Sequence, residues 1–175
     1  MYCNGPTFIY KFSFSLKNYP RLLVVACCFL GSGCSFPANV FEKDVPLPGQ
    51  EWASSNQPTF TFDISNRDTA DLYNVYVVLR HTDAYDFNNI WIRGSAREPG
   101  DTAVHSQRYD LSLADNEKGW TGVGMDDIYE HRIEIQHRTK FNRPGAYSFT
   151  LEQIMREDPL KHVLDVGVRI EKVPE

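Results

Sequence analysis

Apolar and polar residues alternate along most of the chain after residue 58. In the segment TFTFDIS at 59–65, Phe60, Phe62 and Ile64 point to one side, and the residues between them point to the other. A period of two is typical of a β-strand with one buried face. Six further segments show the same alternation, with turn-forming residues between them: 73–82, 89–94, 107–113, 131–137, 145–154 and 163–172. We therefore expect seven strands.

The segment YNVYVVLRHT at 73–82 carries apolar or aromatic side chains on both faces, which indicates a strand in the middle of a sheet. Short, regularly spaced strands separated by polar turns are typical of two packed antiparallel sheets. The expected fold class is all-β, an antiparallel β-sandwich of immunoglobulin-like or jelly-roll type. One helical turn is expected at Glu152–Glu157, where Asp158-Pro159 would end it.

The N-terminal segment has the layout of an export signal. Lys11, Lys17 and Arg21 precede an apolar run, Leu22–Leu30, which is much shorter than the roughly 20 residues of a membrane-spanning helix. Gly31-Ser32-Gly33 then leads into Cys34, an arrangement that resembles a lipobox, where the signal is cut before a cysteine that carries lipid. Cys27, after Val24-Val25-Ala26, is the alternative lipidation site, although a cut there would split the apolar run.

Cleavage before Cys34 divides the chain into a signal peptide at 1–33, a lipidated tether and lead-in at 34–58, and a β-sandwich domain at 59–175. The chain after residue 33 carries 15 basic and 23 acidic residues, a net charge near −8. Such an excess of acidic residues argues against nucleic acid and against anionic lipid as partners. Cys3, Cys27 and Cys28 leave with the signal, so no thiol remains for a disulfide or a metal site.

The remaining candidates for chemistry do not form a catalytic or metal-binding pattern. His131 and His137 would share one face of a strand about 20 Å apart, too far to hold one metal, and we interpret them as solvent-exposed. Asp126, Asp127 and Glu130 lack the spacing of a calcium loop. No serine or cysteine of the exported chain stands in a recognisable nucleophile motif. We therefore expect no catalytic residue, no metal and no cofactor.

Several residues suggest structural roles. Gly119 and Gly122 around Trp120 predict a tight hairpin held by the indole, and Gly167 between two valines predicts close packing or a bulge. Arg80, at the end of the central strand, needs a carboxylate or carbonyl partner if it is buried. A loop and strand start rich in aromatic residues is the predicted partner-facing surface: Tyr85, Phe87, Asn88, Asn89 and Trp91.

Three stretches are more distinctive than strand periodicity requires: YNVYVVLRHTDAYDFNNIWI at 73–92, GWTGVGMDDIYEHRI at 119–133 and GAYSFTLEQIMREDPLKHVLDVGVRIEK at 145–172. Together with the lipoprotein signal and the Val-Phe-Glu lead at 40–42, they resemble the gliding-motility lipoprotein family GldH of the Bacteroidetes. The chain departs from that pattern in its long N-terminal lead and in Leu30, which stands four residues before Cys34 rather than three.

The resemblance implies a non-catalytic lipoprotein that works with other gliding-motility envelope proteins and the linked type IX secretion machinery. We expect a lipid anchor in the outer membrane, facing the periplasm, with no small-molecule substrate. The resemblance also implies O-glycans at Thr69 and Thr102, each in an Asp-Thr-Ala triplet. A lipid-anchored carbohydrate-binding module, with Trp52, Trp91 or Trp120 stacking on sugars, is the main alternative, and a lipid-anchored hydrolase is a third.

Overall fold

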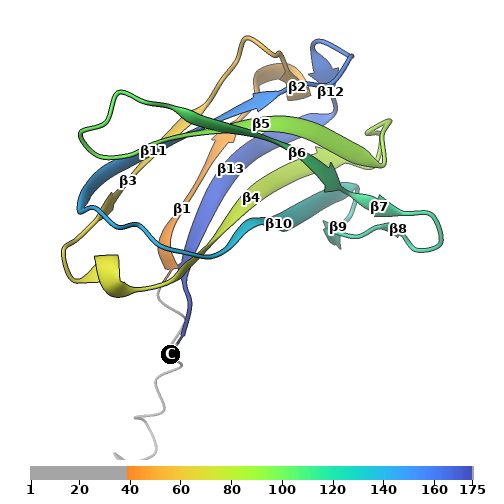
Figure 1. Ribbon diagram of the computed structural model, residues 1–175. Coiled ribbons are helices and arrows are strands. Elements are labelled where there is room, and N and C mark those ends of the chain that lie inside the picture. The colour runs from red at the N-terminus through yellow and green to blue at the C-terminus, as the bar shows by residue number, and fades with distance from the viewer. Residues whose placement is uncertain (1–38, 175) are drawn as a thin grey trace, which may run out of the picture. The chain divides into compact units, whose positions relative to one another are not determined.

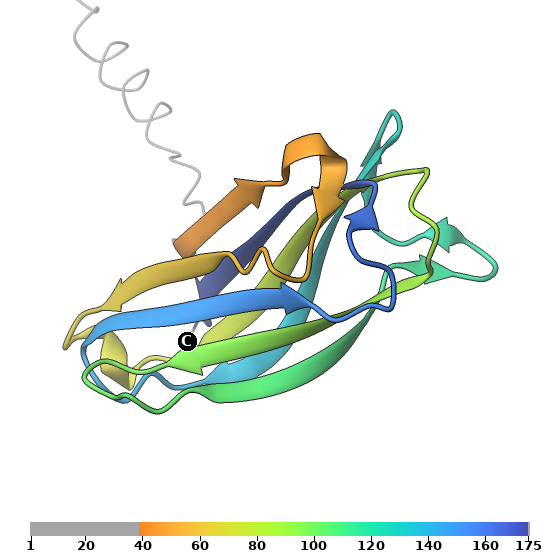
Figure 2. The same cartoon turned by 90° about the horizontal axis from the view of Figure 1, so that it is seen from above.

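Two antiparallel β-sheets pack face to face in the computed structural model, which describes residues 39–174 (Figures 1 and 2). The first sheet contains, in spatial order, β1 (Asn39–Pro46), β13 (Val163–Lys172), β4 (Tyr73–Thr82), β10 (Ile128–Thr139) and β9 (Val123–Met125). The second contains β3 (Thr59–Ile64), β11 (Gly145–Gln153), β5 (Asn89–Arg97) and β6 (His105–Ser112). The predicted all-β sandwich is confirmed.

Short elements close the ends of the sandwich. β2 (Glu51–Trp52) pairs with β12 (Leu160–Lys161), and β7 (Ala114–Asp115) pairs with β8 (Gly119–Trp120) as a small hairpin. Figure 1 shows this hairpin and β9 at the same end of the molecule. Two 3-10 turns, η2 (Pro48–Gln50) and η3 (Asp68–Ala70), occupy connections.

The core consists of alternate residues from the inner faces of both sheets. β3 buries Phe60, Phe62 and Ile64 and exposes the residues between them, so its predicted alternation is confirmed. β4 contributes Tyr73, Val75, Val77, Leu79 and His81, all at most 3% exposed. Burying each large apolar side chain contributes roughly 1.5–3 kcal/mol relative to exposure, so this shared interior is the main source of stability.

All seven predicted strands are present, but the sandwich begins before the predicted boundary at residue 59. Residues Asn39–Pro46 of the predicted lead-in form β1, an edge strand that pairs with β13. Trp52 is completely buried, and its indole N–H donates to the Asn56 carbonyl oxygen at 2.8 Å. The lead-in from residue 39 onward is therefore part of the domain.

The predicted helical turn at Glu152–Glu157 is wrong. β11 continues to Gln153, and the Ile154 N–H then donates to the Trp91 carbonyl oxygen at 2.9 Å. The Gln153 amide donates to the carbonyl oxygens of Trp52 and Glu157 and accepts from the Met155 N–H. Pairing of Glu152 with Arg93 and of Gln153 with Ile92 keeps this part of the chain extended, so a helical turn cannot begin there.

No helix among residues 39–174 is long and apolar enough to cross a membrane. The predicted signal peptide and both candidate lipidation sites, Cys34 and Cys27, lie outside the described residues.

Candidate functional site

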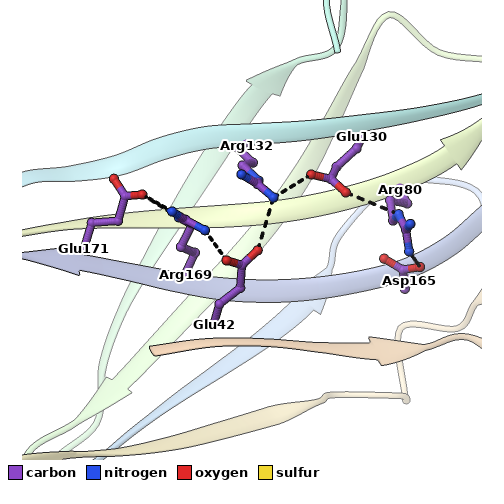
Figure 3. Close-up of polar contacts among 7 residues, drawn as sticks. All are labelled: Glu42, Arg80, Glu130, Arg132, Asp165, Arg169 and Glu171. Carbon is purple, nitrogen blue, oxygen red and sulfur yellow. Dashed lines mark hydrogen bonds and ion pairs between the residues drawn. The ribbon is translucent and has the colours of Figure 1, made fainter. Parts of the chain in front are cut away.

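Seven charged side chains of alternating sign cross the outer face of the five-stranded sheet (Figure 3). We call them the ion-pair chain, and they follow one another in the order Glu171, Arg169, Glu42, Arg132, Glu130, Arg80 and Asp165. They come from β1, β13, β4 and β10. They lie on one face of the sheet because residues directly opposite in neighbouring strands share a face. Isolated surface pairs contribute about 0–1 kcal/mol each, so the network mainly orders this face.

Arg80, at the end of the central strand, is 43% exposed, so the burial that would make a partner necessary is absent, yet it contacts two carboxylates. Its Nη1 lies 3.2 Å from Asp165 Oδ2, and its Nε lies 3.4 Å from Glu130 Oε2. Beneath the network, Val78 points outward yet is 1% exposed, with Gly167 opposite it on β13. A Cβ on Gly167 would lie 1.9 Å from Asp44 Oδ1 and 2.6 Å from the Lys43 carbonyl oxygen, which confirms the predicted close packing.

Acidic side chains outnumber basic ones on this face. Burial raises the pKa of Asp44, and the neighbouring carboxylates of Asp165 and Glu42 raise it further. The pKa of Asp165 is also raised by burial, against the opposing effect of Arg80. Within residues 39–174, however, no three His, Cys, Asp or Glu side chains are placed to hold a metal ion.

A buried histidine pair lies on the opposite, inner side of the same strands. His81 and His131 are 0% and 3% exposed, and their Nε2 atoms lie 3.0 Å apart. The prediction that His131 is solvent-exposed is wrong, because its register opposite Leu79 turns it toward the core. His137 is exposed as predicted, since bulges after Glu134 and Gln136 change the alternation of β10.

Hydrogen bonding fixes how this pair is protonated. His81 Nδ1 lies 2.7 Å from the Thr82 carbonyl oxygen, which can only accept, so His81 carries its proton on Nδ1. His81 Nε2 therefore accepts, and His131 donates from Nε2. Burial lowers the pKa of His81, and burial together with the neighbouring His81 lowers the pKa of His131 to about 4. Both rings are therefore neutral near pH 7.

Aromatic side chains surround the histidine pair. The centroid of the His81 ring lies 4.5 Å from that of Trp120, 5.1 Å from Tyr85 and 5.8 Å from Tyr129. Trp120 thus holds the β7–β8 hairpin against the sandwich, as predicted for the Gly-Trp turn. A Cβ on Gly122 would lie 2.8 Å from His131 Nε2, so a glycine lets the chain pass over the pair.

A hollow of about 510 Å³ opens beside Gly122, at the corner where β9 meets β10. Its lining combines members of the ion-pair chain with apolar side chains: Arg80, Glu130, Arg132, Val123, Met125 and Ile128. Val123 is 80% exposed and Met125 is 73% exposed. In the described part of the chain, three of the five exposed large apolar residues belong to this one corner. This corner was not predicted from the sequence, because GVGM at 122–125 lacks the alternation of apolar and polar residues that is typical of a strand.

The predicted partner-facing residues are only partly at the surface. Tyr85 is 4% exposed, and its hydroxyl donates to the Asn89 carbonyl oxygen, so it supports the loop from below. Phe87 is half-buried against Tyr85. Trp91 is 41% exposed on the outer face of the four-stranded sheet, and Asn88 and Asn89 line a separate polar hollow with Asp110. Trp91 and the two asparagines can therefore contact a ligand, whereas Tyr85 cannot.

The two predicted glycosylation sites differ in environment. Thr102 is exposed in the connection between β5 and β6. Thr69 lies in η3, where its hydroxyl donates to the Asn66 carbonyl oxygen at 2.9 Å.

Comparison with known proteins gives one consistent family. The GldH lipoprotein family model matches residues 39–170. A gliding motility lipoprotein GldH from Flavobacterium johnsoniae is 30% identical over 132 residues, which cover 71% of this chain and 79% of that protein. A GldH homolog from Christiangramia forsetii is 27% identical over 119 residues, which cover 63% of this chain and 72% of that protein.

Among solved structures, the chain is similar to a carbohydrate-binding module, CBM28, specific for non-crystalline cellulose. The TM-score is 0.42 at 10% identity, over 76% of this chain and 73% of that one. The family match covers both sheets of the sandwich, including β1 and most of β13. The chain therefore belongs to the GldH family of gliding motility lipoproteins.

Proposed function

We propose that this chain is a non-catalytic lipoprotein that supports gliding motility, and the linked type IX secretion machinery, by binding other envelope proteins. Family membership supports the role in motility. The observation that carries the binding role is the gathering of Val123, Met125 and Ile128 at one exposed corner. Contiguous apolar side chains at a surface are typical of protein interaction sites.

The attachment to the membrane is proposed to be a lipid on Cys34, in the outer membrane on the side facing the periplasm. The chain after residue 33 is acidic, so its surface charge does not favour anionic lipid. Stable anchoring by acyl groups needs more than one chain, which a fully acylated N-terminal cysteine supplies. Replacing Cys34→Ser should abolish labelling by a fatty-acid analogue and release the protein from membranes. Labelling that persists in this variant but disappears in Cys27→Ser would move the anchor to Cys27.

Gene deletion tests the proposed role most simply. Cells without the gene should lose gliding on glass and should release less of the proteins exported by the type IX machinery, and the wild-type gene should restore both. Normal gliding in the deletion strain would refute the proposed function. Loss of gliding with normal secretion would remove the secretion link alone.

A carbohydrate-binding role remains as a second candidate because of Trp91. Its indole is exposed on a polar sheet face, and hydrogen-bonding side chains lie near it, with Asn89 donating to Asp110 at 2.6 Å. An exposed indole beside such groups can stack on a sugar ring. Saturable quenching of tryptophan fluorescence by soluble glycans, absent in Trp91→Ala, would favour this role. Unchanged fluorescence would exclude the tested glycans.

O-glycosylation at Thr102 and Thr69 is proposed from their Asp-Thr-Ala triplets. Mass spectrometry of the protein isolated from its host should find glycan on Thr102, the more exposed of the two. An unmodified mass for both peptides would refute it.

A further inference from the structure

On the side of β10 that faces away from β4, most of the strand has no neighbouring strand in the part of the chain that the structure describes. β9 pairs only with Ile128–Glu130, and no strand of the described chain pairs with the same side of residues 131–139. A Cβ on Gly122 would lie 2.6 Å from the Glu130 carbonyl oxygen, so this carbonyl faces the β9 side. Because backbone groups alternate in direction along a strand, the N–H and C=O groups of Arg132 and Glu134 face the same side.

Apolar side chains lie directly beside this unpaired edge. Val123 is opposite Glu130 in the register, and Met125 is opposite Ile128. Val123, Met125 and Ile128 all line the hollow at the corner where β9 meets β10. An exposed strand edge invites pairing with another strand, and here the apolar side chains would contact a side chain of that strand.

Arg132 gives the site a charge preference. Its Nη2 contacts Glu42 at 3.4 Å and Glu130 at 3.0 Å, whereas its Nε and Nη1 have no partner within residues 39–174. The side chain is 49% exposed. A guanidinium with free N–H groups binds a carboxylate in a charge-assisted contact, and residues directly opposite in paired strands come close enough for it.

We propose that the corner of β9 and β10 binds an extended segment of another protein, which adds as a strand along β10. An acidic residue of that segment lies opposite Arg132. Val123 already occupies the place opposite Glu130, so the segment leaves the edge of β10 there, and an apolar residue two positions from the acidic one packs on the exposed side chains of Val123 and Met125. The segment therefore has the pattern apolar-any-acidic. This inference deepens the proposed function and rests on its claim that the chain works by binding proteins.

A different protein suits the site better than a second copy of this chain. The chain after residue 33 has a net charge near −8, from 15 basic and 23 acidic residues, and charge of one sign opposes self-association. Strand addition is a common way for a protein to bind an extended peptide, because main-chain hydrogen bonds give affinity and alternate side chains give specificity.

Photo-cross-linking in living cells tests the site directly. A photoreactive amino acid replaces Met125 in the full-length protein, and a control replaces Val104, which is 56% exposed outside the site. We expect an adduct with another envelope protein from position 125 and none from position 104. Mass spectrometry should place the adduct in a segment of the apolar-any-acidic pattern. No adduct, an equal adduct at both positions, or an adduct with a second copy of this chain would overturn the proposal.

A synthetic peptide of the cross-linked segment then tests the contacts. Arg132→Ala should weaken its binding by roughly ten- to a hundredfold, the usual effect of losing a hydrogen bond to a charged group. Arg132→Glu should be rescued by a peptide whose acidic residue is replaced with lysine. Hydrogen exchange at the amides of Arg132 and Glu134 should slow when the peptide binds. Equal binding by wild type and Arg132→Ala, with no protection at either amide, would refute strand addition.

The two hypotheses fail separately. If the photoreactive protein forms the expected adduct but the deletion strain glides normally, the proposed function is refuted and the binding site stands. Loss of gliding on deletion, with no adduct from Met125, would refute the site and leave the motility role intact.

Discussion

Acid should destabilise this domain through the buried pair of His81 and His131. The unfolded chain takes up a proton on each histidine near pH 6.5, whereas the pKa of His131 in the folded protein is lowered to about 4. Between these values the unfolded state binds more protons, so the free energy of unfolding falls as the pH falls from 6.5 toward 4. The loss is absent above pH 6.5 and levels off below about 4.

The size of the effect follows from the shift in the pKa of His131. One pKa unit corresponds to about 1.4 kcal/mol, so the full shift costs about 3 kcal/mol at pH 4. The lowered pKa of His81 acts in the same direction. The raised pKa values of Asp44 and Asp165 act in the opposite direction, because their folded forms hold protons more tightly than the unfolded chain does. The histidine contribution must therefore be isolated with a variant.

Urea unfolding of residues 34–175 across pH 4–8 measures this contribution. His131→Gln removes the titrating group and keeps an amide that can donate toward His81, so it should be less stable than wild type at pH 7.5 and should lose less stability toward pH 4. The gap between the two proteins should narrow by about 3 kcal/mol over that range. His137→Gln, at an exposed position, should keep the wild-type pH dependence. A constant gap between wild type and His131→Gln would refute the reasoning.

Three further predictions concern the sandwich and its outer face. Gly167→Ala should destabilise the domain by about 1–3 kcal/mol through overpacking against Asp44, and hydrogen exchange should show β1 opening more readily; unchanged exchange in β1 would contradict this. Trp52→Ala should cost about 3–5 kcal/mol, the usual cost of emptying a buried aromatic site, as measured by urea unfolding; a loss below 1 kcal/mol would mean that the lead-in is not part of the core. Glu130→Gln, in the middle of the ion-pair chain, should cost at most about 1 kcal/mol, and a larger loss in 0.5 M salt than in low salt would contradict a surface ion pair.

The alternation of apolar and polar residues was sufficient to predict seven strands, namely β3, β4, β5, β6, β10, β11 and β13. It was insufficient for β1, because Glu42, Lys43 and Asp44 are polar on both sides of an edge strand and prolines follow them. β1 is a strand because its backbone pairs with β13, and pairing between residues so far apart in sequence leaves no local signal.

Of the two paired histidines, only the burial of His81 could be predicted from the sequence. The inward positions of β4, from Tyr73 to Leu79, continue to His81, so its burial could have been inferred from the alternation alone. His131 needed the register of β10 against Leu79. The corner of β9 and β10 depends in addition on where the Gly-Trp hairpin leaves the sheet, a geometry set by packing of Trp120 against His81.

Gliding speed of single cells gives the most direct test of the claim that this lipoprotein works in motility through the β9–β10 corner. The only copy of the gene would carry Val123→Asp with Met125→Asp, or Val104→Asp as an equally drastic change at an exposed apolar residue elsewhere. We expect the double variant to reach wild-type levels in the membrane yet to glide as poorly as the deletion strain, while Val104→Asp glides normally. Wild-type gliding by the double variant would contradict the claim.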